Sequence, residues 1–324
     1  MKKILGIGNA LVDVVTFINN DEPLQKLSLP KGSMQLVDGT RSEKIKKETQ
    51  LFPRVLTSGG SAANTIHGLG MLGAMAGFVG STGEDEAGNI FENDLKKAGV
   101  NTYLKRCKTP TGTAIALVTP DGERTFGTHL GAAVEISAED LHPGLFEDYD
   151  ILYLEGYLIY NMPLVTKACT LARENGMAVA LDLASYNVVR ENLGNFNVIV
   201  KEFTDILFAN ELEAEAFTGE KPEKAVLSLS GMCDTVVVKT GEKGSLVSQE
   251  NNIYSIKAFP VNCIDTTGAG DLYASGFLYG LALGKDPATC GIYGAMLASS
   301  VIEITGARIP ESAWPAIKES IKSV

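Results

Sequence analysis

The strongest constraint on the fold is a regular alternation of apolar runs and amphipathic helix patterns that begins near residue 137. The apolar runs "DILYLEG", "MAVALDL", "DILFAN" and "TVVVKTG" are separated by stretches with helical spacing, such as "MPLVTKACTLARENG", and two long helix patterns follow residue 268. Apolar strands that alternate with helices are typical of a parallel sheet covered on both faces. We therefore predict an α/β fold with a central, mostly parallel β-sheet flanked by helices.

The first half of the chain contains strand patterns that fall outside this rhythm. They include "VVTFIN", "GSMQLV" and the hairpin pattern "GTAIALVTPDGERTFGTHLG", whose turn is at residues 120–122. We expect the segments at about 14–38 and 101–130 to form a small separate β-sheet that covers a site as a lid. Residues 1–324 are then one domain, with this lid inserted in its α/β core.

Composition argues against several classes of function. The formal net charge of −11 argues against a broad nucleic-acid surface, and no apolar run reaches the ~18–20 residues that a membrane span needs. The three histidines lack metal-ligand spacing, which argues against a zinc site. The five cysteines are scattered and form no C-x-x-C motif, as expected of a reduced, cytoplasmic protein.

Two familiar nucleotide motifs do not account for the glycines. "GLGMLG" matches G-x-G-x-x-G, but it ends a helix pattern and precedes a strand, whereas a dinucleotide site follows a strand and opens a helix. The chain contains no G-x-x-x-x-G-K-[ST] motif. A dehydrogenase and a standard P-loop enzyme are therefore disfavoured.

The stretch "DTTGAGD", residues 265–271, lies just before a helix pattern. If Gly268, Ala269 and Gly270 form the first turn of that helix, their N–H groups have no partner within it and point outward with the positive end of the helix dipole. Such a turn binds anions, and small residues let a phosphate come close. Asp271 then lies beside the anion, where it can accept the proton of an attacking hydroxyl. The alternative is a capped helix with a glycine-rich entry.

Three other stretches place polar side chains next to predicted strands. "SGGSAAN" combines a Gly-Gly pair with Asn64, which can hydrogen-bond a hydroxylated ligand. "GNALVD" places Asp13 after an apolar strand, where a buried carboxylate needs partners such as two sugar hydroxyls. "NELE" places Asn210 and Glu213 at the C-terminal end of a strand, where ligands bind in open α/β sheets. The alternatives are a flexible helix start, a turn aspartate and a helix N-cap.

These stretches, taken together and in this order, resemble the ribokinase (PfkB) family of carbohydrate and nucleoside kinases. "DTTGAGD" is similar to the C-terminal signature of that family, and "GGSAAN" with "GFVGSTGEDEAG" is similar to its N-terminal signature. The resemblance extends from "GIGNALVD" to "ITGAR", over essentially the whole chain. It implies a ribokinase-like fold with a small β lid, and transfer of the γ-phosphoryl group of ATP to a primary hydroxyl of a small molecule.

The resemblance also implies roles for individual residues. Asp271 is the general base, and the N–H groups of Gly268, Ala269 and Gly270 form an anion hole for the developing charge. The resemblance implies acceptor contacts for Asp13, Gly60, Asn64 and Glu155. The other residues expected to bind the acceptor are Asn9, Gln35, Gly59 and Phe126. The residues implied for ATP and its phosphates are Asn210, Glu213, Gly241, Gly244 and Thr266.

Two cations are implied in the same way. Glu213 would act on Mg²⁺ through water, beside the phosphates of ATP. Many members of the family also need a monovalent cation such as K⁺ next to the anion hole. Asp265 and the carbonyl of Thr267 would be its ligands here.

The acceptor is less constrained than the reaction. "GGSAAN" and "GNALVD" resemble adenosine kinases more than ribokinases, which carry "GGKGAN". We therefore expect adenosine or a related nucleoside as the acceptor. The alternative is a sugar kinase for ribose, fructose or a keto-deoxy sugar, and a more distant one is a non-catalytic ligand-binding regulator.

A nucleoside also needs an apolar slot for its base. Met34, Gln35, Leu36 and Phe126 lie on the expected lid strands and would supply it, the alternative being that they only pack the lid. Arg124 would either swing toward phosphate when the lid closes or remain a solvated hairpin charge. The protein is expected to act as a monomer or as a homodimer formed through the lid.

Overall fold

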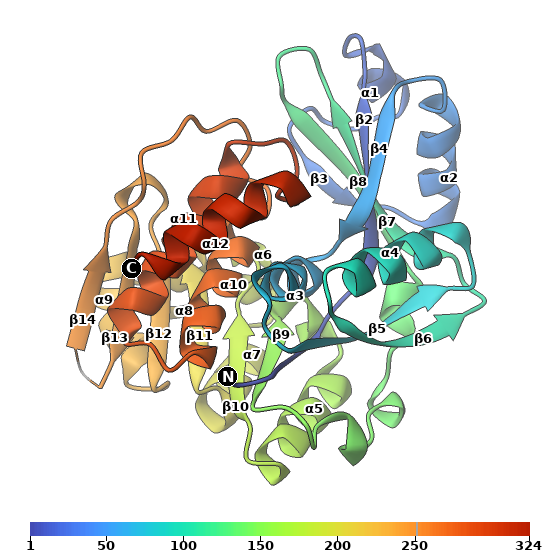
Figure 1. Cartoon of the computed structure of the whole chain (residues 1–324). Helices are drawn as coiled ribbons and strands as arrows, with labels where there is room; N and C mark the ends of the chain where they lie inside the picture. Colours follow the sequence, from blue (N-terminus) through green and yellow to red (C-terminus); the bar gives the residue numbers. More distant parts are fainter. Residues whose placement is uncertain (251) are drawn as a thin grey trace.

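The chain forms two β-sheets, a large one within layers of helices and a small one that projects from it (Figure 1). The computed structural model describes residues 1–250 and 252–324, and all of their side chains except that of Met34. The strands of the large sheet, in spatial order, are β14 (Asn252–Ile256), β13 (Ser245–Gln249), β12 (Thr235–Lys239), β11 (Ile206–Asn210), β10 (Ala178–Asp182), β9 (Ile151–Glu155), β1 (Ile4–Ile7), β5 (Ala76–Gly83) and β6 (Asn101–Cys107).

The strands of the large sheet from β6 to β12 are all parallel, and the pairs β12–β13 and β13–β14 are antiparallel. This confirms the predicted α/β fold with a mostly parallel sheet. Successive residues of β1 belong to different cores, Ile4 to one face and Leu5 to the other, because side chains alternate along a strand. Both faces are therefore covered, as the apolar runs of the sequence require.

Each face of the large sheet carries its own set of helices (Figure 1). One face packs against α3 (Ser61–Leu72), α4 (Glu86–Lys97), α10 (Ala269–Ala282) and α11 (Pro287–Ile302), with α12 (Trp314–Lys322) outside them. The other face packs against α5 (Met162–Glu174), α6 (Tyr186–Glu191), α7 (Leu193–Phe203), α8 (Glu211–Thr218) and α9 (Pro222–Ser230).

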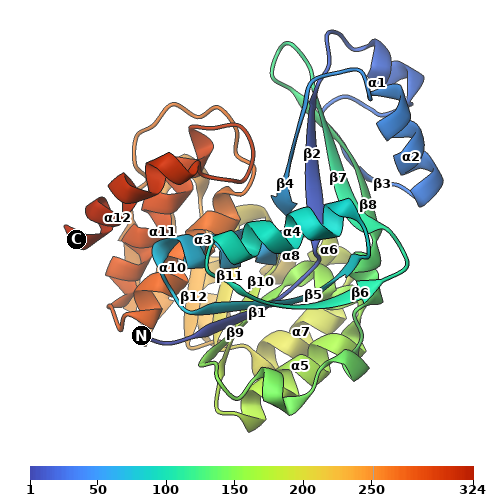
Figure 2. The ribbon, with the colours of Figure 1, turned by 45° about the vertical axis from the view of Figure 1, so that its right-hand side comes forward.

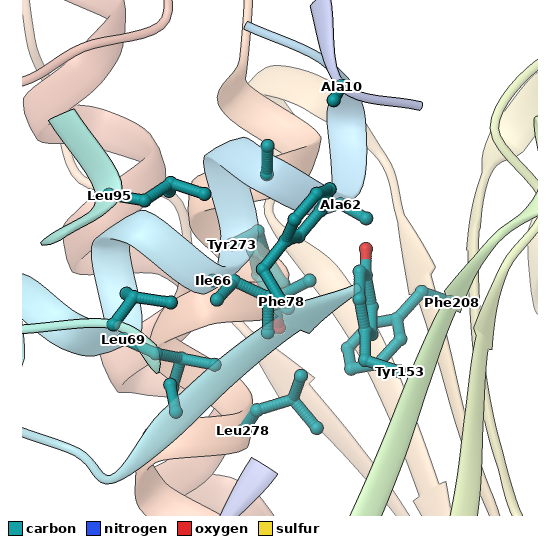
Figure 3. Close-up of a cluster of buried hydrophobic side chains, with 14 of the residues drawn as sticks. Ala10, Ala62, Ile66, Leu69, Phe78, Leu95, Tyr153, Phe208, Tyr273 and Leu278 are labelled. Carbon is teal, nitrogen blue, oxygen red and sulfur yellow. The ribbon is translucent and has the colours of Figure 1, made fainter. Parts of the chain in front are cut away.

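The core on the first face fixes α10 relative to the strands (Figure 3). The Phe208 ring of β11 lies edge-on to the Phe277 ring of α10, with 5.4 Å between their centroids, and the Tyr153 ring of β9 lies 6.4 Å from Phe208. Burial of each of these aromatic side chains contributes about 2 kcal/mol of stability. The start of α10 is thereby held above the carboxyl ends of the strands.

The small sheet stands apart from the body of the protein, with two helices beside it (Figure 2). Its strands, in spatial order, are β3 (Met34–Leu36), β8 (Arg124–Gly131), β7 (Thr111–Val118), β2 (Leu11–Phe17) and β4 (Arg54–Gly59). The accompanying helices are α1 (Glu22–Lys26) and α2 (Gly39–Glu48). Two separate segments of the chain, 11–59 and 111–131, therefore build this sheet.

The expected boundaries of the small sheet need two corrections. Residues 101–107 do not belong to it, because they form β6 and pair in parallel with β5 at the edge of the large sheet. Residues 54–59 do belong to it, as β4, and pair antiparallel with β2. The expected hairpin of β7 and β8 is confirmed.

The pattern of the segment "SAEDLHPGLF" predicts a further α-helix, and this prediction is wrong. The segment forms two short 3-10 turns, Ala138–Asp140 and Pro143–Leu145. Pro143 lacks the N–H that a continuous helix would need at this position. None of the described helices is long and apolar enough to cross a membrane.

Candidate active site

Four polar residues end four adjacent parallel strands of the large sheet. Glu155 ends β9, Asp182 ends β10, Asn210 ends β11 and Lys239 ends β12. The strand register pairs Glu155 with Asp182 and Asn210 with Lys239. Their side chains therefore meet at the carboxyl edge of the sheet, where open α/β proteins bind ligands.

Helix α10 begins at this edge with the turn that the sequence predicted. Gly268 is its N-cap with φ 77°, a left-handed conformation, and a Cβ there would lie 2.6 Å from the Ala307 Cβ. Ala269, Gly270 and Asp271 form the first turn, and the Ala269 N–H donates to the Thr266 carbonyl at 3.2 Å. Thr266 thus shapes the loop that leads into the helix. The turn presents N–H groups at the positive end of a helix, which suits an anion.

The carboxylate of Asp271 is held by two side chains from the start of α3. Ser61 Oγ donates to Asp271 Oδ1 at 2.7 Å, and Asn64 Nδ2 donates to Oδ2 at 2.8 Å. Burial raises the pKa of Asp271, although the hydrogen bonds from Asn64 and Ser61 act in the opposite direction. Ser61 is a site residue that the sequence interpretation treated only as a substitution in the signature.

Four of the predicted acceptor residues, Asn9, Asp13, Gly59 and Gly60, lie together, and Asp271 is close enough to act on the charge of Asp13. Asp13 lies in β2 directly against Gly59, where a Cβ on the glycine would collide with its carboxylate. Gly60 has φ 95°, and a Cβ there would collide with the Asn9 carbonyl, so only glycine fits. Burial raises the pKa of Asp13 to about 6.

Two polar groups in this region have free hydrogen-bonding capacity. Among the described residues, the buried Oδ1 atom of Asn64 accepts no hydrogen bond. The carboxylate of Asp13 likewise takes part in none of the hydrogen bonds found there. A buried polar atom such as Asn64 Oδ1 is usually paired, and the half-buried carboxylate of Asp13 remains accessible, so both acceptors suit a ligand that brings hydroxyl donors.

Glu155 lies behind this group, with 1% of its surface exposed. Its Oε1 accepts from the Asn9 N–H at 2.9 Å and from Asn9 Nδ2 at 2.6 Å, and its Oε2 accepts from the Ala62 N–H at 2.8 Å. Burial raises the pKa of Glu155 to about 7. In this arrangement Glu155 fixes the loop at Asn9 and the start of α3.

Asn210 and Glu213 form a reciprocal cap at the start of α8. Asn210 Oδ1 accepts from the Glu213 N–H at 2.9 Å, and the Glu213 carboxylate accepts from the N–H and the Nδ2 of Asn210, each at 2.7 Å. Glu213 is buried, and burial together with Asp182 raises its pKa to about 7. The helix N-cap that the sequence offered as an alternative is therefore present, and it fixes Glu213 at the same edge as Asp182.

Gly241 and Gly244 lie in the turn between β12 and β13. A Cβ on Gly244 would collide with the Ile256 carbonyl and would lie 2.8 Å from the Ala258 N atom. A cavity of about 360 Å³ adjoins this contact. It is lined by Ser255, Ile256, Lys257, Ala258, Phe259, Ala288 and Ile292. This cavity is largely apolar, as expected of a slot for an aromatic base.

Asp265 does not present a free carboxylate to a monovalent cation. Its Oδ2 lies 2.8 Å from Arg124 Nη1 of the small sheet and accepts from the Gly306 N–H at 2.6 Å. Its Oδ1 accepts from the N–H and Oγ1 of Thr267. A guanidinium already neutralises this carboxylate, so the Asp265 carboxylate does not fit K⁺ in this arrangement, and the role of the Thr267 carbonyl stays a prediction. Arg124 is buried and ion-paired, so the alternative of a solvated hairpin charge is wrong.

The residues proposed for a base slot on the small sheet have mixed surroundings. Leu36 is 66% exposed, so it does not pack the small sheet. Gln35 and Phe126 are half-buried, and Gln35 Oε1 accepts from Arg41 Nη2 at 3.4 Å. The prediction for Met34 concerns a side chain outside the described ones. The base slot formed by Gln35 and Phe126 therefore stays a prediction.

The chain resembles known kinases in sequence and in structure. Residues 38–314 match the model of the pfkB family carbohydrate kinases. The chain is 30% identical to an adenosine kinase of Saccharomyces cerevisiae over 331 residues, 94% of this chain and 96% of that protein. It is 30% identical to a 5-dehydro-2-deoxygluconokinase of Bacillus subtilis over 274 residues, 79% of this chain and 83% of that protein.

A solved structure supports the same relationship. The adenosine kinase of Sinorhizobium meliloti superimposes with a TM-score of 0.89 at 32% identity, covering 98% of this chain and 99% of that one. This agreement includes both the large and the small sheet, since nearly the whole chain is matched. The chain therefore belongs to the pfkB family of carbohydrate kinases, which includes kinases of sugars and of nucleosides.

Proposed function

We propose that this kinase transfers the γ-phosphoryl group of ATP to a primary hydroxyl of a nucleoside, with adenosine as the leading acceptor. The observation that carries the proposed reaction is the arrangement of Asp271 in the first turn of α10, with its carboxylate fixed by Ser61 and Asn64. Relatives named adenosine kinase, matched over nearly the whole chain, support the choice of acceptor.

In this mechanism Asp271 accepts the proton of the acceptor hydroxyl as its oxygen attacks phosphorus. The N–H groups of Gly268 and Gly270 stabilise the charge that develops on the transferred group, while the Ala269 N–H holds the loop at Thr266. Asp13 and the Asn64 oxygen accept hydrogen bonds from the other hydroxyls of the acceptor, which orients it. The cavity beside Gly244 takes the base of ATP.

Mg²⁺ would be bound mainly by the phosphates of ATP. No cluster of three potential ligands suited to a metal is present in the described part of the chain. Both oxygens of Glu213 already accept hydrogen bonds from Asn210, so Glu213 suits contact with Mg²⁺ through water. The ion supplies charge neutralisation of the phosphates.

The acceptor is tested by measuring ATP consumption with Mg²⁺ against a panel of nucleosides, free sugars and keto-deoxy sugar acids. We expect adenosine to give the highest kcat/KM. A higher value for any sugar than for every nucleoside would overturn the proposed acceptor while leaving the role of Asp271 intact. A protein that binds the panel without consuming ATP would be a regulator instead.

A sugar acid is the second candidate, and one observation favours it. Arg308 is buried near Asp13, and among the described residues its Nη1 atom has no hydrogen-bond partner. Arg308 Nε donates to the carbonyl of Ser58 at 3.0 Å, and Ser58 is the first residue of the stretch "SGGSAAN". A guanidinium with a spare donor suits a carboxylate. The relative named 5-dehydro-2-deoxygluconokinase agrees with this alternative.

We also propose that two copies of the chain pair through the small sheet. Strand β4 is an edge strand, and its residues Val55 and Leu56 are 54% and 40% exposed, next to the exposed Phe17 of β2. An edge strand with apolar side chains is a ready template for another strand. Light scattering should give twice the mass of the chain, and V55D/L56D should give the monomer mass. A wild-type monomer at micromolar concentration would contradict this.

ATP dependence and the unpaired cysteines both fit a cytoplasmic protein.

A further inference from the structure

A lysine that no sequence motif singled out lies beside the anion-binding turn. Lys239 ends β12, and its side chain is only 14% exposed. A Cβ placed on Gly270 would lie 3.1 Å from Lys239 Nζ. The ammonium group therefore lies beside the first turn of α10.

The charges around Lys239 explain why it stays protonated. Its Nζ lies 2.9 Å from Asp182 Oδ2, and that carboxylate is also buried. Burial alone would lower the pKa of Lys239, but Asp182 and Glu213 outweigh burial and raise it. Asp271 adds to this effect. A full positive charge is thus fixed next to the turn that receives the phosphoryl group.

Neutralisation of Asp182 does not by itself explain where the ammonium group of Lys239 lies. Asp182 alone could be neutralised from any direction, yet Nζ lies at Gly270, between the carboxylate of Asp182 and the start of the helix. Gly270 leaves this side of the turn open, since any side chain there would press against Nζ. An anion bound by the N–H groups of the turn would then have the ammonium group within its reach.

We propose that Lys239 is a catalytic residue whose ammonium group contacts the phosphoryl group during its transfer. In this step the acceptor oxygen forms a bond to phosphorus, and the bond from phosphorus to the β,γ-bridging oxygen of ATP breaks with its electron pair on ADP. The hydroxyl proton passes to Asp271, and Lys239 keeps its protons throughout. The inference rests on the proposed phosphoryl transfer at Asp271, and it does not depend on which acceptor is used.

The first test compares K239M and K239R with the wild type, using whichever acceptor of the panel the wild type prefers. We expect K239M to lower kcat by about 10²–10³-fold, as removal of one donor to a developing anion does, with the KM of the acceptor nearly unchanged. K239R keeps a positive charge and should recover part of kcat. A folded K239M protein with wild-type kcat would overturn the inference.

A matched variant separates catalysis from structural charge balance. K239M leaves the buried Asp182 unpaired and can destabilise the fold, so the double variant K239M/D182N removes both charges. We expect the double variant to fold and to keep the low kcat, whereas D182N alone should lose much less, because the ammonium group remains. If D182N lost as much kcat as K239M, Lys239 would be only a structural partner of Asp182.

The last readout does not require turnover. A complex of MgADP, aluminium fluoride and the acceptor mimics the phosphoryl group in transfer. K239M should weaken this complex by about the factor that it removes from kcat, while the affinity for MgADP alone changes little. Equal weakening of both would contradict a contact specific to the transferred group. A wild type that prefers a sugar would change the proposed acceptor but not this result.

Discussion

The variant D271N is expected to lower kcat by about 10³–10⁴-fold, because it removes the group that accepts the hydroxyl proton. An amide of the same shape can still accept a hydrogen bond from Ser61 or from Asn64, so the start of α3 and α10 should keep their positions. Binding of ATP and of the acceptor should therefore change much less than kcat. Steady-state kinetics and calorimetric binding measure the two effects separately.

The matched control for this variant is S61A. It removes one hydrogen bond to Asp271 but leaves the carboxylate, so we expect a loss of about fivefold in kcat, the worth of one such hydrogen bond. Turnover of D271N within about tenfold of the wild type would rule out Asp271 as the general base.

The dependence of kcat on pH also tests the role of Asp271 as the general base. Only the ionised carboxylate accepts a proton, and burial raises the pKa of Asp271 above its usual 3.8. Turnover should therefore fall, as pH decreases, at a higher pH than an ordinary aspartate would produce. This acid limb should be absent from the small residual activity of D271N.

The variant E155A is expected to have the largest effect on stability. It leaves the N–H and Nδ2 of Asn9 and the N–H of Ala62 without their buried acceptor. Such unpaired groups cost about 1–3 kcal/mol each, so we expect the free energy of unfolding to fall by about 3 kcal/mol or more. Denaturant titration at about pH 5, below the raised pKa of Glu155, measures this value. A loss below about 1 kcal/mol would mean that Glu155 does not fix the loop at Asn9.

The variant E155Q keeps the size of the side chain and tests the charge. Because the folded pKa of Glu155, about 7, is above the value of 4.5 for a free glutamate, the folded state binds the proton more tightly. The contribution of this group to stability is complete below pH 4.5 and is lost as pH rises through about 7. E155Q should remove this part of the pH dependence. Asp13 and Glu213 also have raised pKa values, so the part of the pH dependence of stability that they cause should remain in E155Q.

The sequence predicted those parts of the fold that local patterns encode. The apolar runs of β9 to β12 and the helix patterns between them specify a covered parallel sheet without any knowledge of pairing. The segment "NTYLKRC" forms β6, in which more and less exposed residues alternate. Such a pattern would suit an edge strand of either sheet. Its partner, β5, follows from tertiary contacts, so the sequence did not show that β6 joins the large sheet. The short β4 was missed because its polar and glycine residues give no clear strand pattern.

The candidate site was predictable where a glycine pattern or a known signature marked it. Asp271, Asn64 and the first turn of α10 lie together as the motif implied. Lys239 and Asp182 were not found, because each is a single charged residue at the end of an apolar strand. Their proximity depends on strand order, since Asp182 and Lys239 lie on strands separated by β11. The ion pair of Arg124 and Asp265 joins residues far apart in the sequence and was equally hidden.

The way the chain passes between the two sheets also limits how the specificity of this protein can evolve. The chain enters the small sheet twice and leaves it twice, through segments 11–59 and 111–131. Exchange of only one of these segments with that of a relative would leave two or three of the five strands of the small sheet behind. A working chimera must transplant both segments and must keep Asp265 and Arg308, which contact them from the body of the protein. New acceptors are therefore more readily gained by point substitutions within this layer than by exchange of modules.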